Sequence, residues 1–255
     1  MLSANELKHL SALKVKKYRE ETRLFMAEGV KQVDEGIRSR YHCDLIVYRP
    51  DAADEINETL RIASKKGIRC EEVKAKELER LADTVHSQGV IGYFRMPQTA
   101  AIDTTSLVLI YLDRINDPGN LGTIIRTADW FGFRDILLSP GCVEVFNPKV
   151  VRASMGSVFR GAFHQVAGIE DLVRLKKTGY SVVTTELEGS DLKRYRPAER
   201  TVIVLSSESH GVLPELASLA DRRVMIPGVK GAESLNVAVA AGIILHKLFE
   251  TGTGK

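Results

Sequence analysis

Cysteine is scarce in this chain of 255 residues. The three cysteines, Cys43, Cys70 and Cys142, are odd in number and widely spaced, which argues against a disulfide framework and against a zinc site. No run of about eighteen apolar residues occurs, so we expect no membrane span. The N-terminal segment lacks the apolar core of a secretory signal and contains acidic residues, unlike a mitochondrial transit peptide. We therefore expect a cytoplasmic protein with reduced thiols.

The fingerprints of several enzyme classes are also missing. No GxGxxG follows a predicted strand and neither GxxxxGKS nor GxxxxGKT occurs, so a dinucleotide or a P-loop nucleotide is not expected. The serines at 206–209 lack the flanking glycines of a hydrolase nucleophile elbow. Because there is no HExxH and no cluster of metal ligands, we predict no metal.

The residues that are present suit a globular protein. The hydrophobic fraction of 44% is enough for a sizeable core, and the net charge of +3 is mildly basic. Basic residues gather near the N-terminus, namely Lys8, Lys14, Lys16, Lys17, Arg19 and Arg23. Such a cluster can bind nucleic-acid phosphates, but the interleaved Glu6, Glu20 and Glu21 are as typical of a solvated helix face.

Residues 1–96 have the pattern of a compact α/β unit. Apolar residues recur at helical spacing in some segments and form short strand-like runs in others. The predicted helices are Ala4–Leu13, Gly29–Arg38, Glu55–Lys65 and Lys76–Ala82, and the predicted strands are Asp44–Tyr48, Arg69–Val73 and Val90–Phe94. Residues 97–106 contain proline and small polar residues without an apolar period, which is typical of a linker.

Residues 107–255 have the pattern of a second α/β unit with a parallel sheet. Leu107–Leu112 is a continuous apolar run, as in a strand that is covered on both faces. Further predicted strands are Asp135–Ser139, Ser181–Thr184, Thr201–Leu205 and Arg223–Ile226, and the predicted helices are Asn120–Phe131, Val150–Arg160, Ile169–Lys177, Leu213–Leu219 and Ser234–Phe249. This alternation predicts a doubly wound sheet, in which ligands bind beyond the C-terminal ends of the strands.

Two of the loops at those ends contain polar residues that suit a ligand site. The loop Asp113–Arg126 leads to a helix N-terminus near Asn120, where backbone N–H groups are free, and Arg126 lies one to two turns further along. The loop Leu205–Gly211 contains Glu208 directly after an apolar strand. Each loop is also compatible with an ordinary capped turn.

A third loop, Ile226–Ala240, contains Pro-Gly and Lys-Gly pairs that force irregular backbone. Ser234 is a candidate N-cap for the helix that follows, and Asn236 is a polar residue at the start of that helix. Because the helix is apolar nearly all round, we expect it to be buried. From the residues alone, the three loops indicate a polar ligand site and no more.

In this order, the three loops resemble the signature motifs of the SpoU (TrmH-type) branch of the SPOUT RNA methyltransferases. The first motif is Asp117-Pro118-x-Asn120-x-Gly122-x-Ile124-x-Arg126, and the third is Ile226-Pro227, Gly231 and Glu233-Ser234-Leu235-Asn236-Val237. The second matches only at Glu208 and Gly211, and residues 152–157 resemble the middle helix of the family. Residues 23–29 and 86–90 resemble, more weakly, the two ends of a ribosomal-protein-like substrate-binding domain.

The resemblance implies both a fold and a reaction. The expected fold is α/β, with a parallel-sheet SPOUT domain that contains a trefoil knot at residues 107–255 and a smaller RNA-binding domain at residues 1–96. The expected reaction moves a methyl group from S-adenosylmethionine to a ribose 2′-hydroxyl of RNA, in a homodimer. Ribosomal RNA is favoured over transfer RNA, because the N-terminal domain resembles that of ribosomal-RNA enzymes.

The resemblance also implies roles for particular residues. The candidate catalytic residues are Asn120, Arg126, Glu208, Ser234 and Asn236. The candidate cofactor-binding residues are Ser206, Ile226, Gly231, Ser234 and Leu235. The candidate RNA-binding residues are Lys14, Lys16, Lys17, Arg19 and Arg23.

Two of these assignments need a physical comment. A guanidinium rarely deprotonates, so we expect Arg126 to hold a phosphate or to stabilise a developing alkoxide rather than to act as the base. The family usually has glycine, which allows close backbone approach, where this chain has Ser206. Two alternatives remain beside the enzyme: a catalytically inactive RNA-binding protein with the same fold and, more remotely, a methyltransferase of small molecules.

Overall fold

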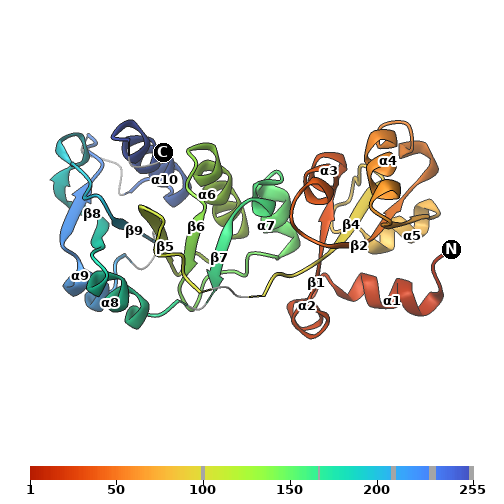
Figure 1. Ribbon diagram of the computed structural model, residues 1–255, viewed down its shortest axis with the longest axis horizontal. Helices are drawn as coiled ribbons and strands as arrows, with labels where there is room; N and C mark the ends of the chain where they lie inside the picture. The colour runs from red at the N-terminus through yellow and green to blue at the C-terminus, as the bar shows by residue number, and fades with distance from the viewer. Residues whose placement is uncertain (99–100, 166, 208–210, 230–233, 253–255) are drawn as a thin grey trace. The chain divides into compact units, whose positions relative to one another are not determined.

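The computed structural model describes residues 1–98, 101–165, 167–207, 211–229 and 234–252, which form two compact units (Figure 1). The N-terminal unit consists of Met1–Gln98 together with Val145–Phe159, and the C-terminal unit of Thr99–Glu144 together with Arg160–Lys255. The segment Val145–Phe159 therefore packs with the N-terminal unit, although it lies inside the sequence range predicted for the C-terminal domain. The contacts between clustered aromatic side chains that are described below explain why this segment packs with the N-terminal unit.

The N-terminal unit is built on a four-stranded mixed sheet with the order β1-β4-β2-β3. Strand β4 is antiparallel to both β1 and β2, and β2 is parallel to β3. The strands are β1 (Leu24–Glu28), β2 (Cys43–Tyr48), β3 (Arg69–Glu72) and β4 (Val90–Arg95). The α-helices of this unit are α1 (Ala4–Ala12), α2 (Lys16–Thr22), α3 (Val30–Arg38), α4 (Asn57–Lys65), α5 (Ala75–Leu81) and α7 (Pro148–Ala153).

Both faces of this sheet are buried. Because side chains alternate along each strand, successive residues point to opposite faces. Met26 and its cross-strand partner Tyr93 pack in one core. On the other face, Phe25 stacks against Phe146 with ring centroids 4.5 Å apart, and Phe94 lies 4.9 Å from Phe159. Large aromatic rings bury much apolar surface, so these contacts hold Val145–Phe159 to the N-terminal unit.

The first helix of the unit is fixed by a capping box. The Ser3 hydroxyl accepts from the Glu6 N–H at 3.2 Å, and the Glu6 carboxylate accepts from the Ser3 N–H at 2.8 Å. The Ser3 N–H, together with the Arg69 guanidinium, lowers the pKa of Glu6 to about 2. Helix α1 therefore begins where the chain itself supplies partners for its free N–H groups.

The C-terminal unit is built on a six-stranded parallel sheet with the order β10-β8-β9-β5-β6-β7 (Figure 1). The strands are β5 (Val108–Asp113), β6 (Asp135–Leu138), β7 (Ala162–Gln165), β8 (Ser181–Asp191), β9 (Thr201–Ser206) and β10 (Arg222–Met225). The α-helices of this unit are α6 (Pro118–Trp130), α8 (Ile169–Lys177), α9 (Pro214–Leu219) and α10 (Val237–Glu250). The predicted α/β fold with a parallel sheet is confirmed, with β5 and β9 at its centre.

Several features of the structure differ from the sequence-based predictions, among them the helix predicted at Val150–Arg160, which is Pro148–Ala153. Strands β1 and β7 and helix α2 were not predicted, and α10 begins at Val237 rather than at Ser234. Strand β8 continues past Thr184 to Asp191 and pairs with β10 across a register shift. The expectation that the last helix is buried all round is wrong, because Val239 and Ile243 of α10 are exposed. No helix in the described part of the chain is long and apolar enough to cross a membrane.

Candidate cofactor and catalytic site

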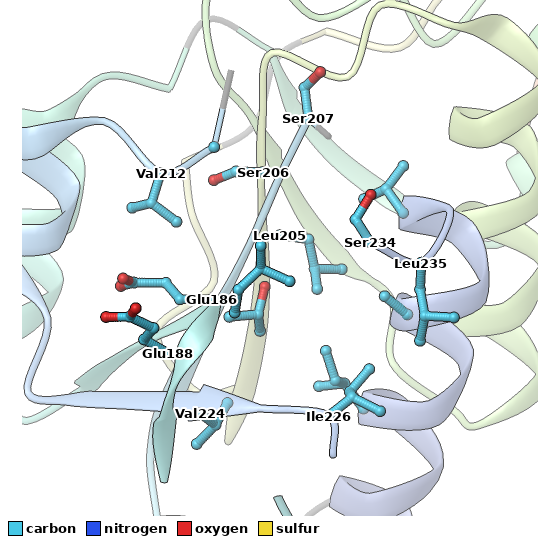
Figure 2. Close-up of a pocket in the computed structure, with 16 residues that line it drawn as sticks. Glu186, Glu188, Leu205, Ser206, Ser207, Val212, Val224, Ile226, Ser234 and Leu235 are labelled. Atoms are coloured by element: carbon cyan, nitrogen blue, oxygen red, sulfur yellow. The ribbon is translucent and has the colours of Figure 1, made fainter. Parts of the chain in front are cut away.

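A cavity of about 500 Å³ lies at the C-terminal ends of β9 and β10 and along the second half of β8 (Figure 2). Its apolar surface comes from the strand ends and from helix α10, through Leu205, Val224, Ile226, Val237 and Ile244. Its polar groups come mainly from the serines and from β8, through Ser206, Ser207, Ser234, Glu186 and Glu188. A mostly apolar hollow with a few placed polar groups is typical of a site for a small organic ligand.

The structure brings together most of the residues predicted to bind the cofactor. Ser206, Ile226, Ser234 and Leu235 all line this cavity, although they come from different loops. Gly231 lies outside the described residues. The four described residues that the resemblance assigns to cofactor binding therefore share one cavity. It lies at the C-terminal ends of the strands, where the sequence predicted a ligand site.

The Ser206 hydroxyl is a polar group in need of a partner. Its oxygen is buried and forms no hydrogen bond within the described part of the chain. Buried polar atoms are nearly always hydrogen-bonded in folded proteins, so a polar ligand in the cavity is a natural partner for it. The residues of the cavity therefore fit a ligand with an apolar body and hydrogen-bonding groups, such as S-adenosylmethionine.

Two carboxylates in the cavity were not found from the sequence. Glu186 and Glu188 extend side by side from β8, on the side of the cavity opposite Ser234 and Leu235 (Figure 2). The Glu186 carboxylate accepts a hydrogen bond from the Thr184 hydroxyl at 2.6 Å. Both glutamates lie beyond the predicted end of that strand at Thr184, so only the full length of β8 reveals them.

Two of the candidate catalytic residues meet at one side of the site. The Asn236 side-chain N–H donates to the side-chain oxygen of Asn120 at 3.0 Å, which joins the start of α10 to the start of α6. The Asn236 oxygen also caps α10, accepting from the N–H groups of Ala238 at 3.0 Å and Val239 at 3.4 Å. The N-cap of α10 is therefore Asn236, and the prediction that Ser234 caps this helix is wrong.

Helix α6 also presents Arg126, another of the candidate catalytic residues. Asp117 caps the helix by accepting from the Asn120 N–H at 2.7 Å, and Arg126 lies exposed further along the same helix. An exposed guanidinium can take a phosphate or a developing negative charge as its partner. Glu208, the acidic candidate of the second loop, lies outside the described residues.

Comparison with known proteins decides the family. Residues 107–246 match the model of the SpoU rRNA methylase family, and residues 4–92 match that of the MRM3-like substrate-binding domain. The chain belongs to the SpoU rRNA methylase family. It is accordingly an RNA 2′-O-methyltransferase with S-adenosylmethionine as the methyl donor.

Relatives with curated names match nearly the whole chain. The 23S rRNA (guanosine(2553)-2′-O)-methyltransferase RlmP of Bacillus subtilis is 31% identical over 248 residues, which cover 95% of each chain. The 23S rRNA (adenosine(1067)-2′-O)-methyltransferase of Streptomyces laurentii is 30% identical, with 90% of this chain and 87% of that protein covered. An AdoMet-bound rRNA methyltransferase from Sinorhizobium meliloti aligns with a TM-score of 0.86 at 34% identity and covers 97% of this chain and 95% of its own. Both units of the chain are therefore shared with these relatives.

The basic residues predicted to bind RNA lie in the substrate-binding part of this methyltransferase. Lys16, Lys17 and Arg23 are exposed, and each lysine pairs with a glutamate one helical turn later, at 3.6 and 3.8 Å. The Lys14 ammonium donates to the Arg80 carbonyl at 2.8 Å. These four residues belong to α2 and its two flanking turns.

Arg19 does not belong to that surface. Its side chain is 1% exposed and donates to the Leu13 carbonyl at 2.6 Å, so it joins α2 to the end of α1. Burial also lowers the pKa of this guanidinium. The prediction that Arg19 contacts RNA is wrong for the folded protein, because its side chain is buried and donates to the chain's own backbone.

Proposed function

We propose that this enzyme methylates a ribose 2′-hydroxyl of ribosomal RNA, with S-adenosylmethionine held in the cavity beside β8, β9 and β10. The observation that carries the proposal is the Asn236–Asn120 hydrogen bond of 3.0 Å. It connects the loop that borders the cavity through Ser234 and Leu235 to the helix that presents Arg126. This hydrogen bond therefore fixes the residues proposed to face the cofactor relative to the residues proposed to face the RNA.

The reaction is a displacement at carbon, and the cofactor supplies a methyl group on a positively charged sulfur. Transfer would break the bond from the methyl carbon to sulfur as the bond to the ribose oxygen forms, which would leave a neutral thioether, and the hydroxyl proton would pass to a phosphate oxygen or to water. Catalysis of this kind depends chiefly on alignment, to which rigid loops contribute most. Arg126 holds a phosphate next to the reacting ribose and stabilises the developing alkoxide, while Asn120, Asn236 and Glu208 keep the loops in place.

Replacing Arg126 by alanine tests this assignment. Arg126→Ala should abolish transfer of labelled methyl groups to ribosomal RNA, because the substrate loses its charged partner. S-adenosylmethionine affinity measured by calorimetry should stay within a few-fold, because Arg126 does not line the cavity. Arg174→Ala, an exposed arginine paired with Asp171 on α8, is the matched control and should keep full activity. An active Arg126→Ala enzyme would remove this residue from the mechanism.

Ribosomal RNA is the proposed substrate class for two reasons. Two curated relatives that match along most of their length, from Bacillus subtilis and Streptomyces laurentii, are named as 23S rRNA methyltransferases. The exposed basic residues around α2 lie within residues 4–92, which match a substrate-binding domain, and phosphate contacts of this kind supply much of the affinity for RNA. A protein that binds ribosomal RNA without methylating it is the alternative that the activity assay excludes or establishes.

A homodimer is also part of the proposal. Helices α6 and α10 pack together, with the Phe131 and Phe249 rings 5.6 Å apart. The two helices leave apolar side chains in solvent, with exposed fractions of 83% for Trp130, 52% for Val239 and 40% for Ile243. Apolar groups gathered in this way are typical of an interface, and a second copy of the chain is the occupant that the family resemblance implies.

Four further expectations complete the proposal. The trefoil knot follows from the family resemblance, as does the role of Gly231 in the third loop. The division into an RNA-binding domain at residues 1–96 and a methyltransferase domain at residues 107–255 is supported by the two family matches. A cytoplasmic location is supported by the three cysteines, which are free thiols.

A further inference from the structure

Arg114, which follows β5 directly, has an unusual backbone conformation. Its φ is 54°, one of three positive values among the non-glycine residues that the structure describes. This left-handed region is uncommon for residues with a side chain, and it persists only where the surroundings hold it. Arg114 was not singled out from the sequence, because a backbone angle leaves no signal in a pattern of side chains.

The side chain of Arg114 makes the contacts that hold it. Its Nε lies 3.1 and 3.2 Å from the two carboxylate oxygens of Asp113, and its Nη2 lies 2.8 Å from one of them. The same Nη2 donates to the carbonyl oxygen of Gly211 at 2.7 Å. Asp113 is only 1% exposed, and its carboxylate raises the pKa of Arg114 through their hydrogen bonds. A charge-assisted pair of this kind is strong and directional.

These contacts reach the loop that follows β9. The backbone N–H of Ser207 donates to the Asp113 carbonyl at 3.0 Å, and the N–H of Gly211 donates to the Ser207 carbonyl at 3.1 Å. Two described residues of this loop are therefore fixed to the C-terminal end of β5. One fixed point is Ser207 on Asp113, and the other is Gly211 on Arg114. Ser207 and Gly211 both line the cavity.

We infer that Arg114 is a positioning residue for cofactor binding. It holds Gly211 against the C-terminal end of β5 and so keeps Ser207 and Gly211, which line the cavity, in the positions that S-adenosylmethionine binding requires. The inference rests on the proposed cofactor cavity. A purely structural role for Arg114 would stabilise the fold without affecting those two positions in particular.

Three variants separate positioning from stability. Arg114→Gly removes the guanidinium and relieves the left-handed backbone, so that the loop contact is lost without added strain. Asp113→Asn combined with Arg114→Gly also removes the buried charge that would otherwise lack its partner. Arg114→Lys keeps the charge but not the planar fork that serves Asp113 and Gly211 together. Arg174→Ala again serves as the control.

Amide hydrogen exchange across residues 205–213 and calorimetric titration with S-adenosylmethionine give the two readouts. We expect faster exchange in this segment and a Kd raised roughly tenfold in Arg114→Gly and in the double variant, the loss expected for one charge-assisted hydrogen bond. Arg114→Lys should fall between these variants and the wild type, and the thermal unfolding midpoint of the double variant should stay near that of the wild type.

Two results would overturn the inference. One is wild-type exchange and wild-type Kd in Arg114→Gly. The other is a Kd that follows the unfolding midpoint across all variants, which would make the role purely structural. A wild-type protein that does not bind S-adenosylmethionine would instead refute the proposed cavity, and the exchange measurement would still decide whether Arg114 holds the loop.

Discussion

Asn236 has two tasks in the structure, and two substitutions separate them. Its side-chain oxygen caps α10, and its side-chain N–H bonds to Asn120. Asn236→Ala removes both. A lost N-cap costs about 1 kcal/mol, and a lost hydrogen bond between side chains that are partly solvated costs about 1 kcal/mol more. Local unfolding of the first turns of α10 should thus become easier by about 2 kcal/mol.

Asn236→Asp retains the cap and loses only the bond to Asn120. A carboxylate accepts the same N–H groups, and its charge suits a helix N-terminus by about 0.3–1 kcal/mol. It cannot donate to the Asn120 oxygen, which it repels. The aspartate variant should therefore keep a stable α10 while losing the connection to α6, whereas the alanine variant loses both.

Native-state hydrogen exchange and single-turnover methyl transfer measure the two tasks separately. The amides at the start of α10 should exchange roughly thirtyfold faster in Asn236→Ala, the factor that corresponds to about 2 kcal/mol, and at nearly the wild-type rate in Asn236→Asp. Both variants should transfer the methyl group more slowly at saturating cofactor. Asn120→Ala should slow transfer to a similar degree.

The double variant decides the reasoning. If the hydrogen bond is what matters, Asn236→Asp should cost little further activity once Asn120 is already alanine, because the partner is gone. Losses that simply add would show that the two residues act independently. Wild-type transfer by both Asn236→Asp and Asn120→Ala would refute the claim that this bond aligns the site, because alanine at position 120 cannot bond to either side chain.

Two other predictions concern surfaces. Ile243→Lys should convert a dimer to a monomer in sedimentation velocity, because it places a charge on the exposed apolar face of α10. Val85→Lys, which changes a 91% exposed apolar side chain of the N-terminal unit, should leave the dimer intact. A monomeric wild type would contradict the proposed interface. Lys16→Gln with Lys17→Gln should weaken RNA binding and reduce the slope of log K against log salt by about one per lost phosphate contact. Lys177→Gln on α8 is its control, and an unchanged slope in the double variant would remove α2 from the RNA-binding surface.

The C-terminal sheet could be predicted because its two central strands are apolar along most of their length. Strand β5, for example, is buried at every position, and a run of this kind is found only where both faces are covered. Strand β7 (Ala162–Gln165) could not be found in the same way. It lies at the edge of the sheet, and of its four residues only His164 is buried.

The N-terminal unit shows what a hydrophobic pattern cannot detect. Helix α2 has the sequence KKYREET, and its single buried residue is Arg19, a charged side chain whose Nη1 donates to a backbone carbonyl. The same lack of pattern led to the wrong placement of Arg19 on the RNA-binding surface. The packing of Val145–Phe159 with this unit depends on contacts of Phe146 and Phe159 with residues more than 50 positions away, such as Phe25 and Phe94. Local periodicity contains no information of that kind.

The site was predicted through its motifs, but its connections could only be seen in the fold. The motif residues Asn120 and Asn236 are 116 positions apart, and only the structure shows that they bond to each other. Glu186 and Glu188 were not predicted as site residues, because they lie on an extension of β8 that strand propensity does not indicate. Several residues that line the cavity could therefore be found from motifs, whereas the contacts that connect its loops could not.

The strand order explains why these connections concentrate at β5 and β9. From β5 the chain continues to β6 and β7 on one side of the sheet, whereas from β9 it continues to β10 on the other. The loops that leave these two central neighbours therefore diverge, and a crevice at such a switch point is where open α/β sheets bind their ligands. Diverging loops need cross-links to keep a fixed shape, and the Ser207–Asp113 and Arg114–Gly211 contacts supply them at that point. Substitutions at the C-terminal ends of β5 and β9 should for this reason affect cofactor binding more than equally buried substitutions in β6 or β7, which lie on one side of the switch point.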